Sequence, residues 1–102
     1  MNLLLITYAL RNRERNYDSF YVALRGNAIQ WWHYIENTHV VFTAYDTNEL
    51  ATRLAIHIEP TDSLLIVPVT GPINGWLPME AWEWLTGRIE AVNNLKSLPP
   101  GT

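Results

Sequence analysis

Apolar positions in the first half of the chain predict a strand, a helix and a hairpin. Residues 3–9 form an apolar run that is too short for a helix, which indicates a buried central strand. Over residues 17–24 the apolar side chains recur at helical spacing behind Asn16, the expected N-terminal cap. Residues 28–35 and 38–44 are rich in aromatic and β-branched side chains and flank a short polar turn, which predicts a β-hairpin.

The second half of the chain predicts a helix, a strand and a final helix. Asp46 and Glu49 form a capping pair ahead of a second helical spacing over residues 50–58. Residues 63–69 read as a fourth strand, and the proline near its end cannot donate to a ladder, which indicates an edge position. After a Gly-Pro break, helical spacing returns over residues 81–89.

The order strand, helix, strand, strand, helix, strand is that of the ferredoxin-like βαββαβ fold. We therefore predict an α+β protein with an antiparallel sheet in the order 4-1-3-2 and an additional C-terminal helix. Right-handed crossovers place the first two helices on one face of this sheet. Residues 1–92 are expected to form a single domain that includes the C-terminal helix, and residues 93–102 a flexible tail.

Both faces of the predicted sheet are apolar, although two helices on one side leave the other face without cover. Neighbouring strand residues point to opposite faces, so Trp31 and Trp32 serve different faces. Large exposed apolar surfaces are rare on monomers, so the second face requires cover. A second copy of the chain is the favoured cover, and the tryptophan-rich C-terminal helix is the alternative. The aromatic side chains expected to pack, in a dimer or within the chain, rather than to stack on RNA bases, are Trp31, Trp32, Tyr34, Trp76 and Trp82.

Composition narrows the class of protein. The chain has 102 residues, of which 48% are hydrophobic and 17% charged, so a disordered polymer is excluded. It has no cysteine, which excludes disulfides, thiolate zinc sites and cysteine catalysis. A net charge of −3 with Lys96 as the one lysine excludes a generally basic nucleic-acid coat. No apolar run is long enough to span a membrane, so we expect a cytoplasmic protein without a membrane partner.

Charged residues gather at one end of the predicted sheet. The topology brings together the loop at residues 11–16, the turn at residues 36–37 and the connection at residues 59–62. Guanidinium groups match phosphate or carboxylate oxygens, so this end is a candidate site for nucleic acid or another anionic partner. The alternative is a solvated loop whose charges balance. The candidate binding residues are Tyr8, Arg11, Arg13, Arg15 and Asn37.

No catalytic, metal or cofactor site is predicted. His33, His39 and His57 lack the spacing of metal ligands, although the first two flank the hairpin and are able to approach each other across it. The sequence contains no Ser-His-Asp order, glycine-rich phosphate loop or zinc-protease motif. A hydrogen-bonded structural role is therefore expected for the histidines.

Several segments resemble a group of small bacterial proteins that genomes label SinR-like. The segments are residues 4–8, 31–35, 62–67, 75–77 and 81–85. This group is similar in turn to the CRISPR-associated adaptation nucleases (the second Cas protein) and to the VapD-like toxins. The resemblance implies a ferredoxin-like homodimer.

The nuclease family carries an aspartate directly after the tyrosine that ends its first strand, where paired copies hold a divalent metal. In this chain Ala9 follows Tyr8, and alanine offers no ligand atom. We therefore expect a non-catalytic homodimer that binds through its arginine loop. The alternatives are a divergent metal-dependent endoribonuclease that uses Glu36, Asp62 or Glu14, and a structural assembly protein without a ligand.

Overall fold

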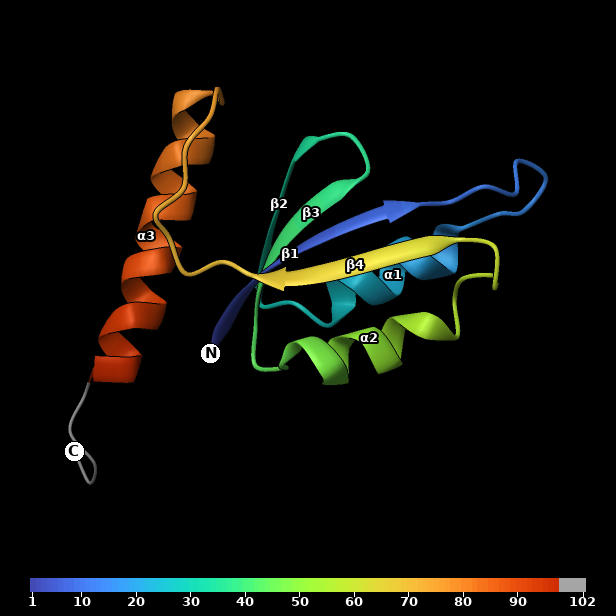
Figure 1. Cartoon of the computed structure of the whole chain (residues 1–102), viewed down its shortest axis with the longest axis horizontal. Helices are drawn as coiled ribbons and strands as arrows, with labels where there is room; N and C mark the ends of the chain where they lie inside the picture. The colour runs from blue at the N-terminus through green and yellow to red at the C-terminus, as the bar shows by residue number, and fades with distance from the viewer. Residues whose placement is uncertain (98–102) are drawn as a thin grey trace.

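The computed structural model describes residues 1–97 and contains, within them, a four-stranded antiparallel sheet and three helices (Figure 1). The predicted α+β class is confirmed. In chain order the elements are β1 (Asn2–Ala9), α1 (Asp18–Gly26), β2 (Gln30–Ile35), β3 (Thr38–Thr43), α2 (Thr47–Ala55), β4 (Ser63–Pro68) and α3 (Met79–Ser97).

The strands are ordered β2-β3-β1-β4, which reads β4-β1-β3-β2 from the opposite edge. All three strand pairs are antiparallel. The edge position that Pro68 indicated for β4 is confirmed, because Pro68 pairs with Leu4 on β1 and nothing within residues 1–97 pairs with the other side of β4. The predicted hairpin is also confirmed, with Asn37 in the left-handed region (φ 55°) at its turn.

Helices α1 and α2 cover one face of the sheet and enclose the main core (Figure 1). The Asp46–Glu49 capping box predicted for α2 is present, since each side chain accepts a hydrogen bond from the other residue's backbone N–H. Asn16 lies one residue outside the position predicted for it: Tyr17 is the N-cap of α1, and Asn16 Oδ1 accepts from the N–H of Asp18. The buried residues of this core are Leu4, Ile6, Tyr8, Phe20, Leu24, Val41, Leu50 and Leu54.

The opposite side of the sheet, here called the far face, is covered by α3 over one half. Leu3, Trp32 and Val40 of the sheet are buried against this helix, which contributes Ala81, Leu85 and Val92. The Arg88 guanidinium on α3 donates to Gln30 Oε1 at 2.7 Å and lies over the Phe42 ring. The C-terminal helix, which the sequence offered as the second choice, is therefore the cover of this half.

The predicted boundary at residue 92 is wrong, because α3 continues through Ser97. Good helix formers such as Leu95 and Lys96 follow Val92, and the first proline comes only at Pro99. The rest of the predicted tail, residues 98–102, lies outside the described residues. In the part of the chain that the structure describes, no helix is both long and apolar enough to cross a membrane.

Candidate functional site

The loop between β1 and α1 extends from the sheet at the end away from α3 (Figure 1). It is held against the segment before β4. The backbone N–H of Arg11 donates to Asp62 Oδ1 at 2.8 Å. The Arg11 guanidinium donates to Ser63 Oγ at 2.9 Å and to the backbone oxygen of Thr61. The loop at residues 11–16 and the connection at residues 59–62 therefore meet, as predicted, and hydrogen bonds from Arg11 help to hold them together.

Asp62 accepts hydrogen bonds on both carboxylate oxygens. Its donors are the N–H of Arg11, the N–H of Glu59 at 2.9 Å and the hydroxyl of Tyr17 at 2.9 Å. Burial alone raises the pKa of this carboxyl, but the two backbone N–H groups and the Tyr17 hydroxyl outweigh it and leave the pKa below its usual value. The charged form of Asp62 thus organises the loop.

The three arginines of this loop differ in what their side chains contact. Arg15 donates to the backbone oxygen of His57 at 3.0 Å and forms an ion pair with Glu59 at 3.4 Å. Glu59 also accepts from Asn12 Nδ2 at 3.0 Å. Arg13 is exposed and has no hydrogen bond or ion pair with the described residues. Of the three arginines predicted to bind a partner, Arg13 is therefore the one whose guanidinium forms no bond to the described residues.

Tyr8 and Asn37 meet through the backbone, since the N–H of Tyr8 donates to the oxygen of Asn37 at 3.0 Å. The hairpin turn therefore lies beside the end of β1, as the topology predicted. The ring of Tyr8 points into the core, where it contacts Phe20 edge-on. Tyr8 thus supports this end of the sheet from inside and does not belong to its exposed surface.

A pair of stacked histidines lies next to Tyr8 on the face covered by α1 and α2. A β-bulge in β2 places His33 over His39, with the two ring centroids 4.1 Å apart. His33 Nδ1 lies 2.8 Å from the backbone oxygen of Thr38 and must carry a proton, because a carbonyl oxygen only accepts. His39 is fully buried, and its Nδ1 lies 3.1 Å from the hydroxyl of Tyr8. The expected structural role of these histidines is consistent with this geometry.

The environment of His39 favours its neutral form. Burial lowers the pKa of His39 to about 4, with smaller contributions from the nearby charges of His33 and Arg25. Burial also raises the pKa of Tyr8. Within the described residues, His39 Nε2 is buried without a hydrogen-bond partner, so no carboxylate stabilises an added charge.

Protonation of His39 is expected to destabilise the fold in mild acid. Its pKa falls from 6.5 in the unfolded chain to about 4 in the folded protein, so the unfolded state binds the proton more readily. The neutral form of His39 therefore contributes about 3 kcal/mol to the free energy of unfolding. This contribution is complete above pH 6.5 and is lost as the pH falls toward 4. Urea unfolding across this range should show a steeper loss for the parent than for His39→Gln. His57→Gln is the control, and equal slopes for parent and His39→Gln would exclude this role.

The predicted aromatic residues differ in exposure. Trp32 is 4% exposed under α3 and contacts the ring of Tyr34 at 5.2 Å. Trp31 is 44% exposed on the other face, where the Arg25 guanidinium lies 4.4 Å from its ring centre. Trp82 is partly buried beside the far face, whereas Trp76 is 98% exposed. Packing within the chain therefore accounts for Trp32 and Trp82 and leaves Trp76 without a contact surface.

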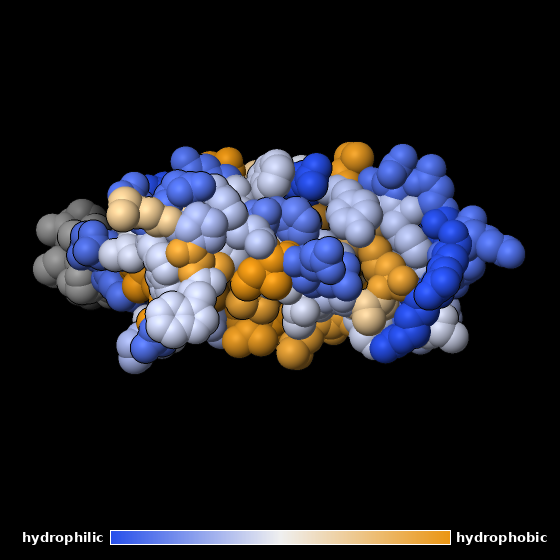
Figure 2. Space-filling view, turned by 90° about the horizontal axis from the view of Figure 1, so that it is seen from above, coloured by the Kyte–Doolittle hydropathy of each residue, from blue (hydrophilic) through white to orange (hydrophobic). Residues whose placement is uncertain are grey.

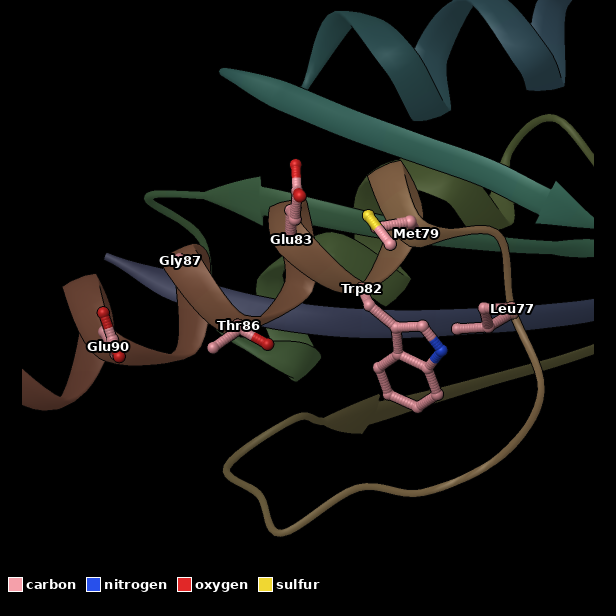
Figure 3. Close-up of a pocket in the computed structure, with 7 residues that line it drawn as sticks. All are labelled: Leu77, Met79, Trp82, Glu83, Thr86, Gly87 and Glu90. Carbon is pink, nitrogen blue, oxygen red and sulfur yellow. The ribbon is translucent and has the colours of Figure 1, made fainter.

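Two hollows flank the N-terminal part of α3. An open groove of about 700 Å³ follows the helix, and the indole of Trp82 extends from α3 toward Leu77 at its wall (Figure 3). A more enclosed pocket of about 190 Å³ lies between α3 and the far face. It was not predicted, because it depends on the position of the connection between β4 and α3. Neither hollow contains a metal-binding cluster: among the residues that the structure describes, no three histidine, aspartate or glutamate side chains are grouped so that they could hold a metal ion.

Comparisons with models of known protein families, with curated proteins and with solved structures find no match to this chain.

Proposed function

We propose that this chain is a non-catalytic, homodimeric protein of ferredoxin-like fold that binds a nucleic-acid strand through the loop that carries Arg13. The strand order and the two helices on one face support the ferredoxin-like assignment. The observation that carries the proposal is the half of the far face that α3 leaves uncovered. Self-association is assigned to the far face of the sheet, and binding to the loop that follows β1.

The uncovered half of the far face, here called the open half, supports the dimer. It is formed by Thr7, Ile35, Leu65 and Val67. The strand register places Leu65, Thr7, Thr38 and Ile35 in one row across the sheet, and Val67 lies two residues along β4 from Leu65. Leu65 is 59% and Val67 41% exposed, although both are β-strand residues on an apolar face. Figure 2 shows apolar side chains gathered in the middle of the molecule and hydrophilic ones at the end that carries the loop. A second copy that covers the open half removes this apolar surface from water.

The arginine loop supports the binding of phosphate groups. Arg11 and Arg15 fix the loop to the segment before β4, and Arg13 extends from this rigid base into solvent. A guanidinium without a carboxylate partner binds a phosphate without first breaking an ion pair. In a dimer two such loops contribute, which raises the affinity for a strand that reaches both.

Arg13→Ala is expected to weaken the binding of single-stranded RNA by roughly threefold to tenfold and to lower the salt dependence by about one phosphate contact. The loop itself should stay folded, because the Arg13 side chain holds nothing in place. Fluorescence anisotropy at several salt concentrations measures both quantities. Arg53→Ala is the matched control, since it removes the same charge from α2. Equal affinities for the parent and Arg13→Ala would contradict the assignment of the loop.

The same samples test the metal-dependent endoribonuclease alternative. Two of the carboxylates near the end of β1 are engaged, Asp62 by three donors and Glu59 by Asn12 and Arg15. We therefore expect RNA incubated with Mg²⁺ or Mn²⁺ to remain intact. Cleavage that stops on addition of EDTA would contradict the non-catalytic proposal and support a metal-dependent endoribonuclease.

A further inference from the structure

Trp76 is the most exposed large apolar side chain among the described residues. It lies on the strap, the segment of residues 69–78 that joins β4 to α3, and 98% of its surface is in contact with solvent. Tryptophan is the residue type most enriched at the centres of protein interfaces, because it buries a large area with little loss of conformational freedom. An indole held in water in this way indicates a surface that is completed by another molecule.

The pocket between α3 and the far face lies on the same strap. Its strap residues are Val69, Ile73, Asn74 and Leu77, and the last three flank Trp76 in the sequence. Its floor includes Leu5 and Val40 of the sheet, and its volume is about 190 Å³. The walls are mostly apolar, so the pocket suits an apolar side chain better than a charged ligand. This chain's own Trp76 does not fill it, because Trp76 is almost fully exposed while its neighbour Leu77 lines the wall.

We propose that Trp76 of a second copy of this chain occupies this pocket, and that the exchange is reciprocal. The inference rests on the proposed homodimer and names the contact that holds it together. An exposed indole and a pocket on the same short segment suit a two-fold axis, because the same surface patch must then serve both subunits. Each strap then provides the indole for the partner and part of the pocket for the partner's indole.

The position of the pocket agrees with the open half of the far face. Ile35 belongs to both, and Leu5 pairs with Val67 in the sheet register. An indole in the pocket therefore brings the second copy over the open half. Two buried indoles contribute roughly 300–500 Å² of contact surface. The apolar residues of the open half supply the rest of the roughly 1,000 Å² or more that a specific interface needs.

The test compares the dimer dissociation constants of three proteins by dilution calorimetry: the parent, Trp76→Ala and Met79→Ala. Trp76→Ala is expected to raise the dissociation constant about 30-fold or more, the effect of removing an interface hot spot. Met79→Ala removes an exposed apolar side chain that does not line the pocket and should change it less than threefold. Thermal unfolding of Trp76→Ala should match the parent at concentrations where both are monomers, because Trp76 supports nothing within its own chain.

A second readout locates the indole directly. In a dimer mixed from isotope-labelled and unlabelled chains, nuclear Overhauser contacts between subunits should join the indole of Trp76 to the methyl groups of Leu5 and Ile73. A monomeric parent would overturn the proposed homodimer and this inference with it. A dimeric parent whose dissociation constant is unchanged by Trp76→Ala would overturn this inference alone and leave the homodimer standing.

Discussion

Trp32→Ala is expected to lower the free energy of unfolding by about 3–5 kcal/mol, the cost of removing a buried aromatic side chain. Trp32 is 4% exposed and lies in the cluster that joins the far face to α3. Removal of the indole leaves a cavity between the sheet and Leu85, which the rigid strands cannot close. The loss should therefore fall on the attachment of α3 as well as on global stability. Urea unfolding measures the global change, and amide hydrogen exchange in α3 measures the local one.

Trp31→Ala is the matched control for this change. It removes the same type of side chain from the preceding residue of the same strand, but Trp31 faces the other side of the sheet and is 44% exposed. Its expected cost is about 1–2 kcal/mol, which includes the loss of the stacking by Arg25. Equal costs for the two variants would show that α3 does not cover Trp32 in solution.

The double substitution Leu65→Glu and Val67→Glu is expected to convert the proposed dimer into a monomer, with a rise of roughly 100-fold or more in the dissociation constant. Both side chains lie on the open half of the far face, where a second copy would bury the new carboxylates without partners. In the monomer the same side chains reach water, so folding should persist. Size-exclusion chromatography with light scattering separates the two species.

Val22→Glu serves as the control for added negative charge. Val22 is an exposed apolar residue on α1, away from the far face. This variant should remain a dimer. A double variant that elutes with the same mass as Val22→Glu and the parent would place the interface elsewhere on the molecule.

The elements of this fold are predictable from the sequence because their signals are local. The capping box at Asp46 and Glu49 requires only neighbouring residues, and so does the effect of Pro68 on an edge strand. The hairpin turn is likewise set by its own residues, with Asn37 in a conformation that asparagine tolerates better than most side chains. Such signals determine elements and their ends within a few residues.

The choice between α3 and a second copy as cover of the far face is not local. The alternation of Trp31 and Trp32 shows only that both faces of β2 are apolar. Which object covers each face depends on the path of the strap, which has no hydrophobic period of its own. In the structure α3 buries Leu3, Trp32 and Val40 and leaves the open half exposed.

In the candidate binding loop, too, the sequence predicts the local elements but not the contacts between distant parts of the chain. The sequence places three arginines near Asp62 and Glu59 but does not say which of their side chains bond to other parts of the chain. Hydrogen-bond geometry across some fifty residues of chain decides it, since Arg11 and Arg15 reach the segment before β4 and Arg13 does not. The stacked histidines depend in turn on a one-residue bulge in β2, which no turn or spacing signal in the sequence reveals.

Sedimentation equilibrium of the unmodified chain at micromolar concentration tests the central claim most directly, namely that the open half of the far face joins two copies. We predict a mass of twice the 11.8 kDa of one chain, with dissociation on dilution. A single species with the mass of one chain throughout that range would contradict the claim, because Leu65, Val67 and Trp76 would then remain in contact with water.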